Sequence, residues 1–333
     1  MRRSPPEPGS FFNGMSPEPA PSRSSTKGIP PVRAAVVHRR AAGRDRLDKT
    51  ERVPVPNDSP VDAIAPLFEI ERARLLGLLR ELDPEAWQRP SPCPGWSVHG
   101  LVTHLLGDDL GLLSRRRDEY MGTPPPEGQS EAEFIDWLDE LQMEWVRAGR
   151  RISPRLLVEL LEWTGPHLIE VLGAEDLTRR VAHVSWAGPD LSPVWLDQLR
   201  ELSEYWIHRQ QLLEALDRPV DLDPTLLHPI LLGLRCALPY RLSQARLASE
   251  GAIEISVGEP IGARWTLVET DGEWEFSTSL PERIVARVSV TADETWRLLT
   301  NNLGIGSGLL DVTGDERLVA IILDTRAIIG HPK

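Results

Sequence analysis

The strongest constraint on the fold is a change in the spacing of apolar residues near residue 250. Over residues 59–245 they recur at helical intervals, in segments such as VHGLVTHLLGDDLGLLSRRRDEY and SPVWLDQLRELSEYWIHRQQLLEAL. The loops between these segments are mostly short enough for a helical bundle. After residue 250 short β-rich segments follow, AIEISVG, ARWTLVET, EWEFST and ARVSVTA, and helical segments then return. The chain is therefore predicted to be mainly α, with a helical bundle followed by a small α+β domain.

Three segments are expected from these patterns. Residues 1–58 contain SPPEPGS and SPEPAPSRSSTKG, and such dense proline without an apolar period predicts a disordered extension. This extension is basic, so it is either a tail that contacts an acidic partner or membrane surface, or a dispensable addition from a start codon assigned too far upstream. Residues 59–245 form the predicted bundle, with Ser59 as the cap of its first helix and Pro60 at the first helical position. Residues 246–333 form the predicted α+β domain.

Charge and composition limit the possible partners. The net charge is −13, and residues 1–60 carry eleven Lys/Arg against six Asp/Glu, so residues 61–333 carry −18. A folded body this acidic is a poor nucleic-acid binder, because phosphate contacts need a basic face. No apolar run reaches the roughly 18–20 residues of a membrane span, and no apolar region follows the basic N-terminus as in a secretory signal. We therefore expect a cytoplasmic protein that binds neither membranes nor nucleic acids; its oligomeric state is not indicated.

The segment SEYWIHRQQ contains a Glu and a His spaced four residues apart. In a helix, Glu204 and His208 lie on one face, one turn apart, so both side chains could bind the same divalent metal. A helical wheel places them opposite the apolar stripe, which is also what a solvent-exposed polar face would show. The spacing leaves both interpretations open, and a metal site needs a third ligand from another helix.

A resemblance to a known family supplies that third ligand. The stretch PCPGWSVHGLVTHLLGDDLGLLSRRRD resembles the N-terminal domain of the mycothiol-dependent maleylpyruvate isomerase family, which is part of the DinB-like metal-binding four-helix-bundle superfamily. Members carry a CPGW-like loop, a capped helix with His in a V-x-H-L context, and Glu-x3-His on the last bundle helix. These positions correspond to His104, Glu204 and His208. The resemblance covers roughly residues 60–330, and its C-terminal part is similar to a sterol-carrier fold.

The resemblance implies a thiol-dependent function. Family membership implies a divalent metal, with zinc the expected ion, that binds mycothiol or a similar low-molecular-weight thiol and holds it as thiolate. The protein would then be an isomerase or thiol S-transferase acting on a small electrophile. The alternative is a non-catalytic module of the same fold that binds a metal or small molecule. Gln211 occupies a position where many members have Asp, and LLTNNLGIG replaces the usual W-G-R helix, so both departures weaken transfer of the isomerase's own substrate.

Further residues were assigned roles around this site, and no catalytic residue was identified. Asp108 and Gln211 are expected to lie next to the metal ligands and to orient their imidazole rings. Arg235 and Arg241 are candidates for binding a substrate carboxylate, and His167 is the substitute if one metal ligand is wrong. The remaining assignments are structural: Cys93, Cys236, Trp96 and Trp206.

Overall fold

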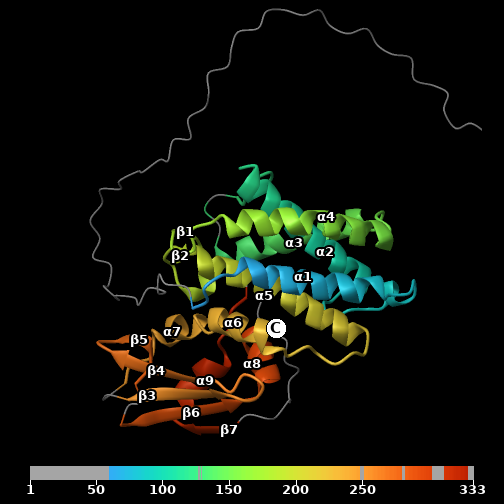
Figure 1. The fold of residues 1–333 in the computed structure, drawn as a ribbon. Helices are drawn as coiled ribbons and strands as arrows, with labels where there is room; N and C mark the ends of the chain where they lie inside the picture. The colour runs from blue at the N-terminus through green and yellow to red at the C-terminus, as the bar shows by residue number, and fades with distance from the viewer. Residues whose placement is uncertain are drawn as a thin grey trace, which may run out of the picture. The chain divides into compact units, whose positions relative to one another are not determined.

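The computed structural model describes residues 60–126, 128, 130–247, 251–279, 282–301 and 311–328. The predicted disordered extension, residues 1–58, and the predicted helix cap at Ser59 lie outside these ranges. All described residues belong to one compact unit. The described chain contains a helical part and a smaller α+β part in the predicted order, so the predicted fold class is confirmed (Figure 1). The boundary between residues 245 and 246 remains a prediction.

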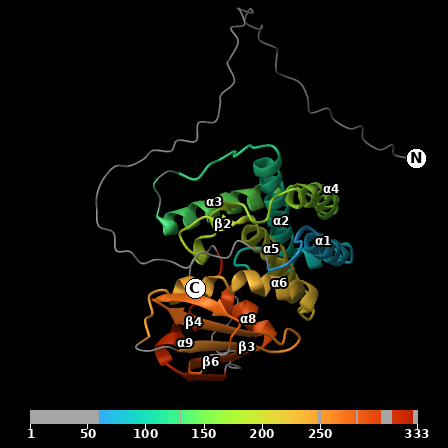
Figure 2. The same ribbon diagram turned by 60° about the vertical axis from the view of Figure 1, so that its left-hand side comes forward.

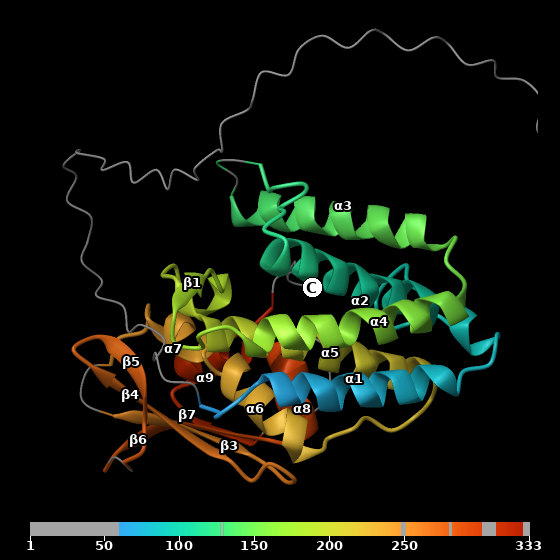
Figure 3. The same ribbon diagram turned by 45° about the horizontal axis from the view of Figure 1, so that its top comes forward.

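Four helices form the bundle. Helices α1 (Ala65–Arg80), α2 (Val98–Leu112), α4 (Pro154–Gly173) and α5 (Val194–Ala215) pack so that α1 and α2 each contact both α4 and α5. The additional helix α3 (Glu131–Gly149) packs against α2 on the outside of this group (Figure 3). The metal-ligand candidates therefore lie on two helices, α2 and α5, that are in direct contact.

The helix starts follow local capping chemistry. The Ser97 side chain accepts a hydrogen bond from the third amide of α2, and Ser153 does the same for α4. Helix α1 begins later than predicted, at Ala65, after an N-cap residue without a side-chain cap. Pro60 lies in a bend, so the expectation that it occupies the first helical position is wrong.

Short elements connect the bundle helices and continue the chain after them. The segment between α4 and α5 forms a small antiparallel strand pair. The apolar segment after α5 forms two helices, α6 (Pro224–Leu234) and α7 (Ala237–Leu242). The remaining short elements are η1 (Ala86–Gln88), a π-helical turn η2 (Leu113–Arg117), β1 (Arg180–Ala182), η3 (Ser185–Ala187) and β2 (Ser192–Pro193).

The C-terminal part is a five-stranded sheet with two helices. Its strand order is β5-β4-β3-β6-β7, and only the pair β3–β6 is parallel. Figure 2 shows β4, β3 and β6 side by side in this sheet. Asp271 and Gly272 connect β4 to β5 with positive φ angles, as a tight hairpin turn requires. Four of the strands match the predicted segments, whereas β7 was not predicted. The bounds are β3 (Ala252–Val257), β4 (Arg264–Thr270), β5 (Glu273–Ser277), β6 (Ile284–Val290), α8 (Ala292–Leu299), β7 (Asp311–Gly314) and α9 (Glu316–Leu323).

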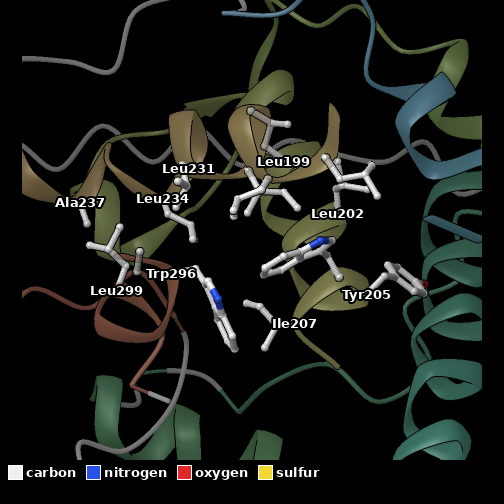
Figure 4. Close-up of a cluster of buried hydrophobic side chains, with 14 of the residues drawn as sticks. Leu199, Leu202, Tyr205, Ile207, Leu231, Leu234, Ala237, Trp296 and Leu299 are labelled. Carbon is white, nitrogen blue, oxygen red and sulfur yellow. The ribbon is translucent and has the colours of Figure 1, made fainter. Parts of the chain in front are cut away.

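An apolar core joins the bundle to the sheet. Helix α8 packs on α6, and helix α9 packs on α7. Trp206 of α5 and Trp296 of α8, both fully buried, meet edge to face with ring centroids 5.3 Å apart. Figure 4 shows Trp296 among the apolar side chains of α5 and α6, including Leu199, Leu202 and Leu231. The helix that carries Glu204 and His208 is thus held on its opposite side by the C-terminal part.

Candidate metal centre

Helices α2 and α5 bring the three predicted ligands together. His104 lies in the middle of α2, and Glu204 and His208 lie one turn apart on α5. The Nε2 atom of His104 is 3.1 Å from His208 Nε2 and 3.3 Å from Glu204 Oε1. His208 Nε2 is 2.9 Å from the same Glu204 oxygen. Among the described residues, these three therefore form a group whose ligand atoms lie within 4.8 Å of one another.

The spacing of these atoms suits a tetrahedral metal. Zinc bonds to histidine nitrogen and carboxylate oxygen are about 2.0–2.2 Å long, so neighbouring ligand atoms lie about 3.3–3.5 Å apart in a tetrahedron. Two of the three separations, 2.9 and 3.1 Å, are slightly shorter, and the third, 3.3 Å, lies at the lower end of this range. Two imidazoles and one carboxylate are also a donor set suited to zinc and similar divalent ions. The residues present fit the metal that the family implies.

The site is buried on the histidine side and open on the glutamate side. The His104 side chain is 3% exposed and that of His208 is 11% exposed, whereas that of Glu204 is 39% exposed. A small molecule could therefore reach the group past Glu204 while the protein encloses the imidazoles. A catalytic metal site keeps such a position open for water or substrate.

The two α5 residues stabilise each other's charged forms. Burial by itself would raise the pKa of Glu204, but the charge of His208 and hydrogen bonds from both histidines hold that pKa well below its usual value. Burial would lower the pKa of His208, and the Glu204 carboxylate outweighs it, so the His208 pKa lies well above its usual value. A metal cation would replace the proton that this arrangement binds to His208.

Asp108 lies beside the group but outside it. One turn after His104, its Oδ2 atom is 3.2 Å from His104 Nε2, the nitrogen that also faces Glu204 and His208. This oxygen is buried and has no hydrogen-bond partner in the described part of the chain. Burial raises the Asp108 pKa to about 7; the His104 charge acts against this shift, and Glu204 adds to it. Asp108 was predicted to orient the imidazoles, and the structure places it on their metal-facing side.

Gln211 lies within hydrogen-bond distance of His208 Nδ1, the ring nitrogen that faces away from the ligand group. Its Oε1 atom lies 2.7 Å from His208 Nδ1 and accepts a hydrogen bond from that nitrogen when Nδ1 carries the proton. This arrangement leaves Nε2 free to bind a metal and is typical of a supporting partner. The same Gln211 oxygen accepts a hydrogen bond from the Cys93 thiol at 3.1 Å. Sequence reasoning treated Cys93 as a structural residue of the CPGW loop and missed its proximity to the site.

The CPGW loop also supplies an aromatic wall. The Trp96 ring lies 4.9 Å from the His104 ring, centroid to centroid, and its Nε1 points at Met143 Sδ, 2.9 Å away on α3. The loop is closed by backbone hydrogen bonds between Ser91 and Trp96 and between Cys93 and Trp96. Trp96 therefore restricts the orientation of the His104 imidazole, a role that adds to the predicted packing role.

The interpretation of α5 as having a solvent-exposed polar face is wrong. Asp197, Glu201 and Gln211 are all less than 9% exposed, because α5 is surrounded by neighbouring helices. Its charges find partners across those helices: Arg209, for example, binds both carboxylate oxygens of Glu71 on α1, at 2.6 and 2.9 Å. Glu204 and His208 lie in this buried polar environment.

The other predicted site residues contact different parts of the structure. The Arg235 guanidinium lies over the Phe276 ring, 4.4 Å from its centroid, and Arg241 donates a hydrogen bond to Asp324 at 3.1 Å. Substrate binding by these two arginines remains a prediction. His167 contacts the exposed Trp163 on α4 instead of the ligand group. Burial raises the pKa of Cys236 to about 12, as expected for a structural thiol.

Part of this chain matches one protein-family model. Residues 68–213, which contain all three ligands, match the mycothiol maleylpyruvate isomerase N-terminal domain. An uncharacterized protein found in two strains of Mycobacterium tuberculosis is 29% identical over 139 residues, or 42% of this chain. The match spans about half, 51%, of that relative's length. A crystal structure of the mycothiol-dependent maleylpyruvate isomerase aligns over 78% of this chain and 93% of its own, with 18% identity and a TM-score of 0.47.

Within the described ranges, no helix has both the length and the apolar character needed to cross a bilayer.

Proposed function

We propose that the protein binds a divalent metal and a low-molecular-weight thiol, because residues 68–213 match the mycothiol maleylpyruvate isomerase N-terminal domain. His104, Glu204 and His208 would hold the metal, with zinc the expected ion and mycothiol the expected thiol. The reaction would be isomerisation of a small electrophile or transfer of the thiol to it. The convergence of three ligand atoms from two helices, 2.9–3.3 Å apart, is the observation that carries this proposal.

The metal would supply one kind of chemistry: a bound divalent cation lowers the pKa of a thiol and raises its nucleophilic thiolate fraction at neutral pH. The protein supplies the arrangement. Gln211 fixes the tautomer of His208, and Trp96 fixes the orientation of His104. The partly exposed Glu204 side leaves room for the thiol to enter.

The experiment that tests the proposal measures metal content by elemental mass spectrometry. Wild-type protein and a His104→Ala/His208→Ala variant would be purified in parallel with zinc supplementation. We expect about one divalent ion per wild-type chain and none in the variant. A metal-free wild type after supplementation would reject the proposal, and equal metal in both proteins would reject the site.

A second candidate function is a metal-binding module without catalysis, which the neutral Gln211 in place of the family's Asp favours. The two candidates differ in their behaviour toward thiols. Metal-loaded enzyme should bind mycothiol and lower its pKa, as followed by thiolate absorbance during a pH titration. A non-catalytic module need not do either.

A further inference from the structure

Asp108 is a buried carboxylate that the protein leaves partly unsatisfied. Its side chain is 24% exposed, but the Oδ2 atom is fully buried and accepts no hydrogen bond from any described residue. A buried polar atom without a partner costs roughly 1–3 kcal/mol, so most such atoms in native proteins have one. His104 Nε2 lies 3.2 Å from this atom.

A metal in the site would remove the remaining possible partner. An imidazole nitrogen bound to a metal carries no proton, so His104 Nε2 could no longer donate a hydrogen bond to Asp108. Asp108 is also outside the group of ligand atoms within 4.8 Å of one another among the described residues. The carboxylate would then lie next to the metal ligands, aimed at their site and bound to none of them.

We propose that Asp108 Oδ2 binds the small molecule instead of the metal, by accepting a hydrogen bond from the molecule that enters beside His104, Glu204 and His208. This inference rests on the proposed metal site and adds a positioning residue to it. The preferred partner is a neutral or cationic hydrogen-bond donor, such as the N–H or O–H of a thiol-bearing compound. Glu204 and Glu201 add negative charge close to Asp108, so an anionic group would be repelled there.

Asp108→Asn tests this role because it retains the size of the side chain and removes its charge. The full-length variant would be loaded with cobalt, and N-acetylcysteamine, a neutral compound that carries a thiol and an amide N–H, would be titrated while the visible absorption of cobalt is followed. Asp108→Ala provides a second variant, and Asp139→Asn, on the exposed side of α3, is the matched control. Cobalt affinity would be measured separately, by competition with a chelator.

We expect the Asp108 substitutions to weaken thiol binding and to leave cobalt binding nearly unchanged. Both Asp108 variants should bind cobalt within about twofold of wild type, and N-acetylcysteamine about ten- to a hundredfold more weakly, the range for a hydrogen bond to a charged group. Unchanged thiol affinity would overturn the inference. A tenfold loss of cobalt affinity would also overturn it, since Asp108 would then be a metal ligand. Failure of wild type to bind cobalt is a different result, which would reject the proposed function itself.

Discussion

Helix α2 carries two consecutive aspartates with opposite surroundings. Asp109 is fully buried, and its Oδ1 accepts hydrogen bonds from Arg72 and Tyr205, both at 2.6 Å. Its Oδ2 accepts one from Thr164. Asp108 points about 100° away around the helix, toward the ligand group, and its Oδ2 has no partner among the described residues. The hydrogen bonds of Asp109 join α1, α4 and α5 to α2. The Oδ2 atom of Asp108 has no such bond in the described structure and is available to accept one from a ligand.

The largest expected effect is the loss of stability when the hydrogen bonds of Asp109 are removed. Asp109→Ala leaves the buried Arg72 guanidinium without its counter-ion, and one of its nitrogens, Nη1, already has no hydrogen-bond partner in the described structure. Breaking a buried ion pair in this way costs about 3–5 kcal/mol. We expect urea denaturation of the metal-free protein to show this decrease in the free energy of unfolding.

Asp108→Ala is the matched comparison for this measurement. Because Asp108 Oδ2 has no hydrogen-bond partner to lose among the described residues, we expect its removal to lower the free energy of unfolding by less than about 1 kcal/mol, or to raise it. If Asp108→Ala and Asp109→Ala lowered the free energy of unfolding equally, the different surroundings of the two aspartates would not affect stability.

The next effect concerns Glu204, the exposed member of the ligand group. Glu204→Gln retains the shape of the side chain and removes the charge that faces both histidines. A neutral amide is a poor ligand for zinc, so metal affinity should fall by on the order of a hundredfold, with little change in the metal-free fold. Chelator competition measures this change. Glu170→Gln, on the exposed surface of α4, should bind metal like wild type.

The raised pKa of His208 predicts how metal binding depends on pH. The Glu204 carboxylate favours the charged imidazolium in the metal-free protein, and a metal requires the neutral ring, so binding must release this proton. Metal affinity should therefore rise about tenfold per pH unit below the His208 pKa and level off above it. Affinities measured from pH 5 to 9 test this trend. Glu204→Gln should move the levelling point to lower pH, and a flat profile for wild type would contradict the assignment of His208.

Sequence analysis predicted the order of helices and strands because apolar spacing reports local structure directly. It did not predict burial and ion pairs that depend on tertiary contacts. A wheel drawn for α5 alone cannot show that α1, α2 and α6 enclose it, and its charges therefore looked solvent-exposed. The pairing of Arg209 with Glu71, 138 residues away, carries no local signal. Spacing suggested Glu204 and His208 as a possible ligand pair, and the resemblance added His104. The difference between Asp108 and Asp109 is visible only in the structure.

The smallest expected effect tests Gln211, the position that departs from the family pattern. Gln211→Asp places a carboxylate against His208 Nδ1, where Gln211 Oε1 now lies at 2.7 Å. A carboxylate partner makes the imidazole a stronger metal ligand, so metal affinity should increase by less than about tenfold. Gln211→Ala removes the acceptor altogether and should decrease affinity by about tenfold, the lower end of the range for such supporting partners.

These two substitutions also separate metal binding from catalysis. Gln211→Asp adds a negative charge and makes His208 a stronger donor to the metal, so the pKa of a bound thiol should rise while metal content changes very little. The Cys93 thiol donates a hydrogen bond to Gln211. Cys93→Ser in the Gln211→Asp background retains a hydrogen-bond donor to the new carboxylate, so this double variant is a control for the loss of the Cys93 thiol. Identical thiol pKa values for wild type and Gln211→Asp would show that residue 211 only orients His208.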